Sequence, residues 1–244
     1  MSTSERRSSV RTGVVWDAVA ARLAGQPGHV RVVDIGGGTG GFAVRLAGQG
    51  HTVTVVDPSP DALAALDRRA DEAGVADLVT GVQGDVADLE AHVEAGTADV
   101  VLCHGVLEVV PDPAAALRTI AGVLRPGGLL SLLVAQRHAA VVARAMAGHF
   151  QQALALLDDS PSPGQPTGRA GRRYTADEVA GLLTGAGFDL DSVHAVRVFA
   201  DLVPGSLLDL EPGATAALVE LERAVAGRAE YLPLATQVHV LATR

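Results

Sequence analysis

Lysine is absent from this sequence of 244 residues: all 19 basic residues are arginines, and the formal net charge is −9. A broad basic face that binds nucleic acid regardless of its sequence is therefore excluded, and no DNA partner is expected. A small anionic ligand or a local RNA contact stays compatible with this charge. Cysteine is almost absent too, since Cys103 is the only one, which excludes an intrachain disulfide and a cysteine cluster with zinc-ligand spacing. We expect no metal site.

Long apolar runs are missing as well, and no stretch approaches the length that crosses a membrane without charges. The first dozen residues are polar and rich in arginine and serine, without the apolar core of a secretory signal. We therefore expect a cytoplasmic protein with no membrane partner. The length and a hydrophobic content of 48% suit one α/β domain that spans residues 1–244.

Strand and helix signals alternate along the chain. Apolar runs predict seven strands, at residues 30–35, 51–56, 78–83, 98–103, 129–135, 193–199 and 236–242. Helical periodicity predicts helices between most of them. We expect an α/β fold with a Rossmann-like, mostly parallel sheet of seven strands, helices on both faces and an antiparallel C-terminal strand.

Two segments stand outside this alternation. Residues 1–25 form a predicted N-terminal helical cap, because apolar residues recur at helical spacing over residues 10–24. Residues 136–173 are predicted to insert over the active site as one long helix, with its apolar positions at 142–157, and a mobile loop at 158–173 that contains three prolines and three glycines. Thr175, followed by Glu178, is a capping-box start for the next helix.

A glycine-rich turn follows the first predicted strand. Asp34 lies near the end of this strand, and Gly36, Gly37 and Gly38 come directly after it. Glycines let backbone amides approach a ligand closely at the N-terminus of a helix. The turn is also a signature of dinucleotide binding, so it predicts a nucleotide-like ligand. The alternative is a tight turn that binds nothing.

Two further carboxylates follow strands. Asp57, with Pro58 after it, ends the second strand, where a carboxylate can accept hydrogen bonds from both hydroxyls of a ribose. Its alternative role is to cap the following helix. Asp85 follows the third strand, where it could accept a hydrogen bond from an adenine amine, with Gly84 and Val86 beside the ring. The alternative is a plain turn residue, since aspartate is common in turns.

His104 follows the fourth predicted strand, at the mouth of the same crevice. It could contact the ligand through its backbone, or act as a base near the reacting group. A histidine packed for structural reasons is the alternative, and we interpret His104 as a binding residue before a catalytic one.

These motifs together resemble those of class I S-adenosylmethionine-dependent methyltransferases. The pattern Asp34-x-Gly36-Gly37-Gly38-x-Gly40, the acidic residues Asp57 and Asp85, and a Leu-Arg-Pro-Gly-Gly turn at 124–128 occur in the order of that family. Over nearly the whole chain the sequence also resembles the bacterial tRNA 5-carboxymethoxyuridine methyltransferases, which esterify a carboxylate on the wobble uridine. The segments that carry this second resemblance are residues 31–34, 103–108, 112–113, 124–132, 147–150 and 196–199.

The resemblance implies S-adenosyl-L-methionine as the cofactor. It implies that Arg11, in the leading helix, pairs with the cofactor carboxylate, that Gly36 and Gly37 approach its methionine part, that Asp57 holds the ribose and that His104 lines the site. An acceptor carboxylate that is already ionised needs no general base, so positioning suffices. We hypothesise that Arg197, and also Arg137, hold that carboxylate; a structural ion pair is the alternative for Arg197.

The sequence departs from the tRNA methyltransferases on the acceptor side. Ala200-Asp201-Leu202 stands where family members usually have His-Asp-Tyr, and Gln136 stands where they tend to have asparagine. Three hypotheses therefore stay open: methylation of the wobble uridine of tRNA, methylation of a small metabolite in a biosynthetic pathway, and a cofactor-binding protein that transfers no methyl group. The same scaffold carries many small-molecule methyltransferases.

Overall fold

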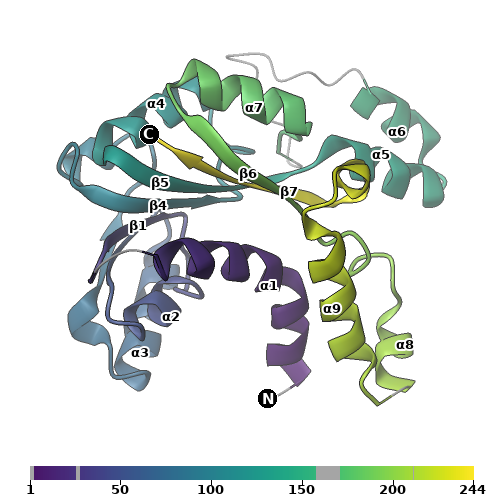
Figure 1. The fold of residues 1–244 in the computed structure, drawn as a ribbon, viewed down its shortest axis with the longest axis horizontal. Coiled ribbons are helices and arrows are strands. Elements are labelled where there is room, and N and C mark those ends of the chain that lie inside the picture. The colour runs from purple at the N-terminus through teal and green to yellow at the C-terminus, as the bar shows by residue number, and fades with distance from the viewer. Residues whose placement is uncertain (1–2, 26–27, 158–170, 211) are drawn as a thin grey trace.

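The computed structural model describes the backbone of residues 3–25, 28–157, 171–210 and 212–244, and the side chains of these residues except 3–11, 205, 209 and 210. Its centre is a sheet of seven strands in the order β3-β2-β1-β4-β5-β7-β6 (Figure 1). The strands are β1 (Arg31–Ile35), β2 (Thr52–Asp57), β3 (Val79–Gln83), β4 (Ala98–His104), β5 (Leu124–Ala135), β6 (Asp189–Val196) and β7 (Gln237–Thr243).

Parallel pairing joins the strands from β3 to β5, and β7 runs antiparallel between β5 and β6. The central strands are continuous apolar runs because helices cover both of their faces. The predicted Rossmann-like fold and its antiparallel C-terminal strand are thereby confirmed. Among the described residues no helix is both long and apolar enough to span a membrane.

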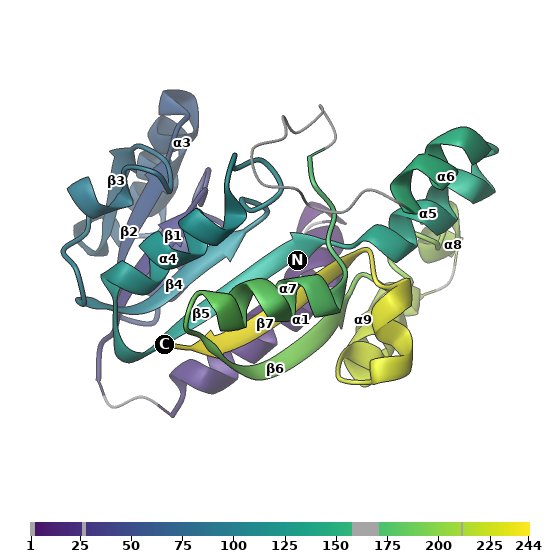
Figure 2. The same ribbon diagram turned by 90° about the horizontal axis from the view of Figure 1, so that it is seen from above.

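Helices lie on both faces of the sheet, as predicted. Figure 2 shows α4 and α7 across one face and α1 on the other. The helices are α1 (Thr3–Leu23), α2 (Ala43–Ala47), α3 (Pro60–Glu72), α4 (Pro113–Val123), α5 (Arg137–Met146), α6 (Phe150–Leu157), α7 (Ala176–Gly185), α8 (Gly205–Leu210) and α9 (Ala214–Ala226), with short 3-10 turns at Ala76–Leu78, Leu89–Ala91 and Ala229–Leu234.

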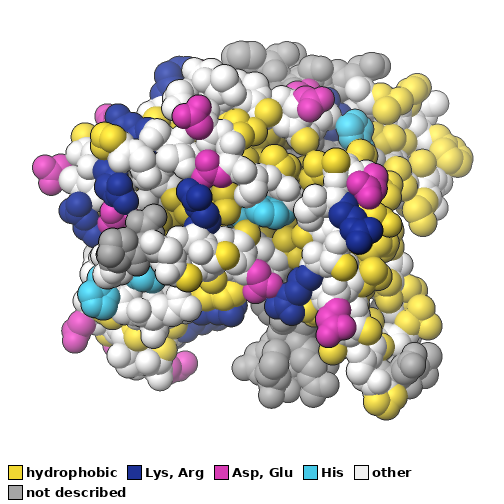
Figure 3. Space-filling model, viewed as in Figure 1, with side chains coloured by type: hydrophobic (Ala, Val, Ile, Leu, Met, Phe, Trp, Pro, Cys, Tyr) yellow, Lys and Arg dark blue, Asp and Glu magenta, His cyan; other side chains and the backbone are white. Residues whose placement is uncertain are grey.

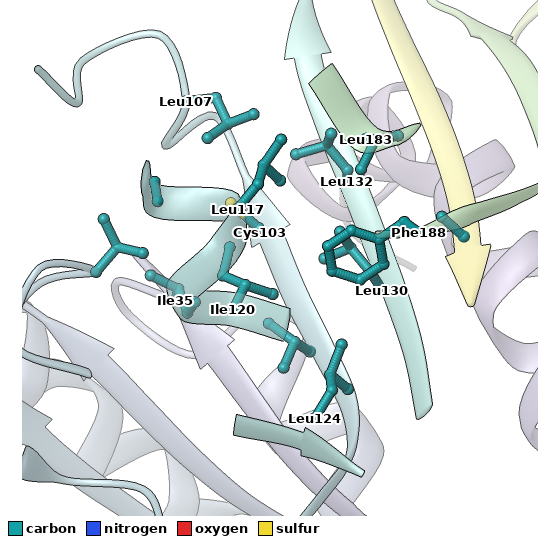
Figure 4. Packing of buried hydrophobic residues seen from close by; sticks show 14 of the residues in the cluster. Ile35, Cys103, Leu107, Leu117, Ile120, Leu124, Leu130, Leu132, Leu183 and Phe188 are labelled. Carbon is teal, nitrogen blue, oxygen red and sulfur yellow. The ribbon is translucent and has the colours of Figure 1, made fainter. Parts of the chain in front are cut away.

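A separate apolar cluster fills each side of the sheet. On one side, α4 and α7 pack against β1, β4, β5 and β7, and Figure 4 shows this packing around Leu117, Ile120 and Leu132. On the other side, Trp16 and Val19 of α1 pack with residues of α2 and the strands. The Arg45 guanidinium lies 3.5 Å from the centre of the Trp16 ring, which ties α2 to α1.

Several helix starts follow from local sequence. Ser59 caps α3 by accepting from the amide of Ala62, so this cap belongs to Ser59. The capping box between Thr175 and Glu178 forms at α7 as predicted. A cap of this kind stabilises a helix by about 1 kcal/mol.

The predicted single helix over residues 142–157 is wrong: the structure has two helices there. The chain breaks between α5 and α6, where Gly148 adopts a left-handed φ of 77°. The start of α5 at Arg137 was also missed; the side chain of Gln136 caps it by accepting from the amides of His138 and Ala139. Of the predicted loop at 158–173, residues 158–170 lie outside the described part of the chain.

The predicted strand 193–199 ends early, at Val196. Arg197 adopts a φ of 61°, which interrupts the extended backbone. The amides of Val198, Phe199 and Ala200 donate instead to the carboxylate of Glu222, a residue of α9 that is only 1% exposed. A distant buried carboxylate, invisible to local periodicity, therefore decides where β6 ends.

Candidate functional site

The carboxyl ends of β1, β2 and β4 open into a cavity of about 430 Å³. Strand order reverses here, since β2 and β4 pair with opposite edges of β1, and ligands bind at such a switch point in open α/β sheets. The volume suits a small organic ligand. Of the residues predicted from the sequence, these line the cavity: Gly36, Asp57, Pro58, Asp85, Val86 and His104.

The glycine turn leaves no room for side chains at two positions. A Cβ on Gly36, whose φ is 67°, would lie 2.7 Å from Cγ2 of Val106. A Cβ on Gly37 would lie 2.6 Å from Oδ2 of Asp34 and 2.9 Å from Cγ1 of Val55. The turn is therefore packed from below by Asp34, and its bare backbone forms part of the cavity wall.

Asp57 closes this turn from the neighbouring strand. Its Oδ2 accepts from the amide of Gly38 at 2.8 Å, and its Oδ1 accepts from the amide of Ser59 at 2.9 Å. The side chain thus supports the backbone of both turns, whereas the capping role that we considered as its alternative belongs to Ser59. A carboxylate has about four lone-pair sites, so each oxygen of Asp57 retains one for a ribose hydroxyl, and both roles are compatible.

Asp34 is almost fully buried beneath the turn, with 3% of its surface exposed. Burial, and next the negative charge of Asp57, raise the pKa of the Asp34 carboxyl to about 7. Asp34 therefore carries a proton part of the time near neutral pH. It supports the turn from behind and does not line the cavity wall.

Asp85 lines the cavity but also has a local role. Its Oδ1 accepts from the amide of Ala87 at 2.6 Å, and its own amide donates to Asp88 at 2.7 Å. The turn role considered as the alternative is thus present, and the exposed carboxylate keeps further lone pairs for an amine. Gly84 precedes it, where a Cβ would lie 2.8 Å from Nε2 of His92.

His104 ends β4 and lines the cavity. Burial lowers the pKa of its imidazole to about 4, so the ring is neutral near pH 7. Its Nε2 lies 2.8 Å from Oγ of Ser131 on β5, and its ring meets that of Phe42 edge-on at 5.0 Å. These contacts hold the ring in one orientation at the cavity.

Comparison with known proteins agrees with this geometry. The family described as "Methyltransferase domain" matches residues 8–193. The tRNA 5-carboxymethoxyuridine methyltransferase of Escherichia coli (strain K12) is 31% identical over 98% of this chain and 89% of its own length. The ubiquinone biosynthesis O-methyltransferase of Xanthomonas axonopodis pv. citri (strain 306) is 38% identical over 53% of this chain and 52% of its own.

Among solved structures, a SAM-dependent methyltransferase from Methanosarcina mazei superposes with a TM-score of 0.62. It has 17% sequence identity and covers 92% of this chain and 96% of that one. The chain belongs to the S-adenosylmethionine-dependent methyltransferases. The predicted cofactor and reaction class are thereby confirmed.

The cavity of this methyltransferase fits S-adenosylmethionine on the features described above. The turn has no space for side chains at Gly36 and Gly37, so it meets the cavity with bare backbone at Gly36, and Asp57 has free acceptor sites at the end of β2. The predicted contact of Arg11 lies outside the described side chains, although Arg11 belongs to α1. No group of His, Cys, Asp or Glu side chains in the described part of the chain could hold a metal ion.

Both arginines predicted to hold the acceptor carboxylate are found in ion pairs. Nη2 of Arg197 lies 2.6 Å from Oδ1 of Asp201, which is the structural pair considered as its alternative. Nη2 of Arg137 lies 2.8 Å from Oε2 of Glu178 and donates to the carbonyl oxygen of Arg173. Nε of each arginine is buried without a partner in the described part of the chain. Their role toward the acceptor stays a prediction.

Sequence reasoning did not assign the wall of the cavity formed by residues 105–111. Arg172 holds this wall by donating to the carbonyl oxygens of Val110 and Pro111, and the Tyr174 hydroxyl donates to that of Leu107 at 2.7 Å. The only sequence signal for this wall was the resemblance of residues 103–108 to the tRNA methyltransferases. Nothing in the local pattern links the wall to Arg172, about sixty residues later in the chain.

Proposed function

We propose that this methyltransferase esterifies a carboxylate, and that its acceptor is 5-carboxymethoxyuridine at the wobble position of tRNA. The observation that carries the proposal is the identity with the E. coli tRNA enzyme, which extends over 98% of this chain and therefore includes the acceptor side. The ubiquinone methyltransferase, by contrast, matches only 53% of this chain.

The chemistry of the cavity supports a carboxylate acceptor. Bound S-adenosylmethionine supplies an electrophilic methyl group on a sulfonium sulfur. An ionised carboxylate attacks without losing a proton, so the protein has to orient it and exclude water. His104 is neutral, and its Nε2 is already hydrogen-bonded to Ser131, which suits a group that orients a ligand.

The arginines beyond β5 and β6 can hold the acceptor while they keep their ion pairs. A guanidinium has five N–H donors, and Arg197 uses one nitrogen, Nη2, for Asp201. Arg137 likewise uses Nη2 for Glu178, and Nε of both residues has no partner. Each guanidinium then keeps N–H donors that are available to a carboxylate.

A second candidate function is methylation of a small acidic metabolite. The segment that follows Arg197 favours it, because Ala200 and Leu202 replace the histidine and tyrosine usual in the tRNA enzymes. With these side chains lost, fewer polar and stacking contacts are available for a nucleoside.

The test is a methylation assay with purified protein, S-adenosylmethionine and tRNA from a strain that lacks its own carboxymethoxyuridine methylation. Mass spectrometry of the digested nucleosides should detect the methyl ester of 5-carboxymethoxyuridine. The Asp57→Ala variant should produce none. Tight cofactor binding with no ester on tRNA, and turnover of a small carboxylic acid instead, would replace the tRNA proposal with the second candidate.

A further inference from the structure

A line of four polar side chains runs from the cavity across neighbouring strands. His104 on β4, Ser131 on β5, His239 on β7 and His194 on β6 contribute one side chain from each of four adjacent strands. Oγ of Ser131 lies 2.8 Å from Nε2 of His104 and 2.8 Å from Nε2 of His239. Nδ1 of His239 lies 3.2 Å from Nδ1 of His194.

The middle of this line, which we call the His104–His194 chain, is fully buried, and His194 at its far end is partly exposed. Ser131 and His239 have no exposed surface. His194 and His239 are directly paired in the sheet, and their rings stack at 5.2 Å. A buried polar group without a partner is costly, so this arrangement is stabilised by having every link made.

Oγ of Ser131 has no partner other than these two imidazoles in the described part of the protein, so its proton goes to one of them and two arrangements remain. A neutral imidazole has one N–H and one lone pair, and the serine hydroxyl has a single proton. In one direction, His104 donates through Nε2 to Ser131, and Nδ1 of His104 carries a lone pair. In the other, the hydroxyl of Ser131 donates to Nε2 of His104, and Nδ1 carries the proton. His104 lines the cavity and its Nδ1 has no hydrogen-bond partner among the described residues, so the first arrangement offers a lone pair to a ligand and the second offers a donor.

We propose that Ser131 and His239 are positioning residues that hold His104 as the Nδ1–H tautomer, so that a carboxylate in the cavity meets a hydrogen-bond donor. The proposal rests on the proposed carboxylate acceptor, because an anionic oxygen favours a donor and is repelled by a lone pair. His239 then donates through Nε2 to Ser131 and accepts at Nδ1 from His194. Every link is satisfied, with all three imidazoles neutral.

Burial favours the neutral form of the three imidazoles in the His104–His194 chain. It lowers the pKa of His104 and of His194, and it lowers that of His239, where the charges of His104 and His194 act in the same direction. A proton added to His104 or His239 would place a charge where burial already lowers the pKa. The His104–His194 chain therefore acts through the direction of its hydrogen bonds and not through a charge.

Nitrogen NMR on wild-type protein with labelled histidine tests the tautomer directly. The protein is measured at pH 7.5 with S-adenosylhomocysteine, and the His104 signals are assigned by their loss in His104→Gln. We expect a protonated Nδ1 and an unprotonated Nε2 at His104. A protonated Nε2 with a free Nδ1 would overturn the proposal and favour an acceptor hydroxyl that needs a base. The tautomer is read from the wild-type protein itself, and the His104→Gln variant serves only to assign the signals.

The Ser131→Ala variant tests positioning. It should mix the two tautomers of His104 and lower kcat/KM for the acceptor about tenfold at saturating S-adenosylmethionine. Ser192→Ala is the matched control, since Ser192 is a partly buried serine on β6 whose side chain makes no hydrogen bond in the described part of the chain. The control should keep the wild-type tautomer and activity. A Ser131→Ala protein with the wild-type tautomer and rate would overturn the proposal.

The two proposals fail in different ways. If no carboxylate is methylated, the proposed function fails whatever the tautomer. If carboxylate esters form but His104 carries its proton on Nε2, the function stands and the positioning role of Ser131 and His239 fails.

Discussion

The cofactor side and the acceptor side of the sheet are built differently. Around β1, β2 and β4 the site consists of short turns, and each contact joins residues of one turn or of neighbouring strands, as with Gly38 and Asp57. Around β5 to β7 several polar contacts join distant segments, such as Arg137 with Glu178 or Glu222 with Val198. A local motif is therefore enough to recognise the first side, and the second depends on how the whole chain packs.

The surfaces differ as well. Beyond β5, apolar side chains gather on the outside of α5 and α6 (Figure 3), and Met146, Phe150 and Leu154 are 74%, 69% and 57% exposed. At the cofactor cavity the apolar floor of Ile35 and Val56 is buried, and Val109 of the cavity wall is 63% exposed. Variants on each side should therefore affect cofactor and acceptor separately.

The largest effect is expected at Asp57. Asp57→Ala removes the acceptor of the Gly38 and Ser59 amides together with the proposed ribose contact, so affinity for S-adenosylmethionine should fall by at least about a hundredfold. Calorimetric titration measures this. Asp61→Ala, an exposed carboxylate on the first turn of α3, should bind like wild type. If Asp57→Ala retains wild-type affinity for S-adenosylmethionine, Asp57 does not bind the cofactor, and the cofactor side and the acceptor side of the sheet are not distinguished by this residue.

Asp34 should make stability depend on pH. Its pKa is raised from 3.8 to about 7 in the folded state, so the folded protein holds a proton that the unfolded chain releases between these values. Its contribution to stability is therefore present at low pH and is lost as the pH rises from 4 to 7. The Asp34→Asn variant has no carboxyl group at this position and lacks this loss. The free energy of unfolding of the variant minus that of wild type should therefore increase by about 3 kcal/mol from pH 4 to pH 7.

Urea unfolding without cofactor at several pH values measures this difference. Effects of the buried histidines cancel in the comparison because both proteins contain them. A difference between variant and wild type that stays constant from pH 4 to 7 would contradict the raised pKa of Asp34.

Gly37 should be sensitive to a single methyl group. In Gly37→Ala the added Cβ meets Asp34 and Val55 at less than 3 Å, so the free energy of unfolding should fall by about 2 kcal/mol and cofactor affinity should fall with it. Gly41→Ala is the matched control, because nothing lies within 4 Å of its added Cβ. Equal stability of the two variants would show that the turn adapts easily.

On the acceptor side a smaller effect is expected at Arg197. Arg197→Ala should lower kcat/KM for the acceptor about tenfold at saturating cofactor, while affinity for S-adenosylmethionine changes less than about twofold. Asp201→Asn removes only the ion pair and should have a smaller effect on kcat/KM. If Arg197→Ala and Asp201→Asn behave alike, Arg197 serves structure alone.

The parts that sequence predicted well are those with a local cause. The glycine turn and the capping box at Thr175 each involve residues a few positions apart. The succession of β1 to β5 along the chain also follows from alternating apolar runs. These features obey short-range rules of backbone conformation, and so they could be predicted without the fold.

The parts that sequence missed depend on contacts that no local pattern contains. The break at Gly148 requires only one left-handed residue within a periodic apolar stretch. The apolar spacing continues on both sides of it, and so it predicted one helix in place of two. The role of Ser131 appears only when β4, β5, β7 and β6 lie side by side.

The sequence by itself determined the reaction class and the cofactor site of this methyltransferase, because a glycine turn and strand-end carboxylates at set spacings shape a site through the local backbone. The tertiary structure alone decided where β6 ends, which carboxylates pair with Arg137 and Arg197, and how His104 is oriented. Those outcomes depend on burial. A polar group removed from water takes the partner that the packed sheet brings to it, however far apart the two are in the chain.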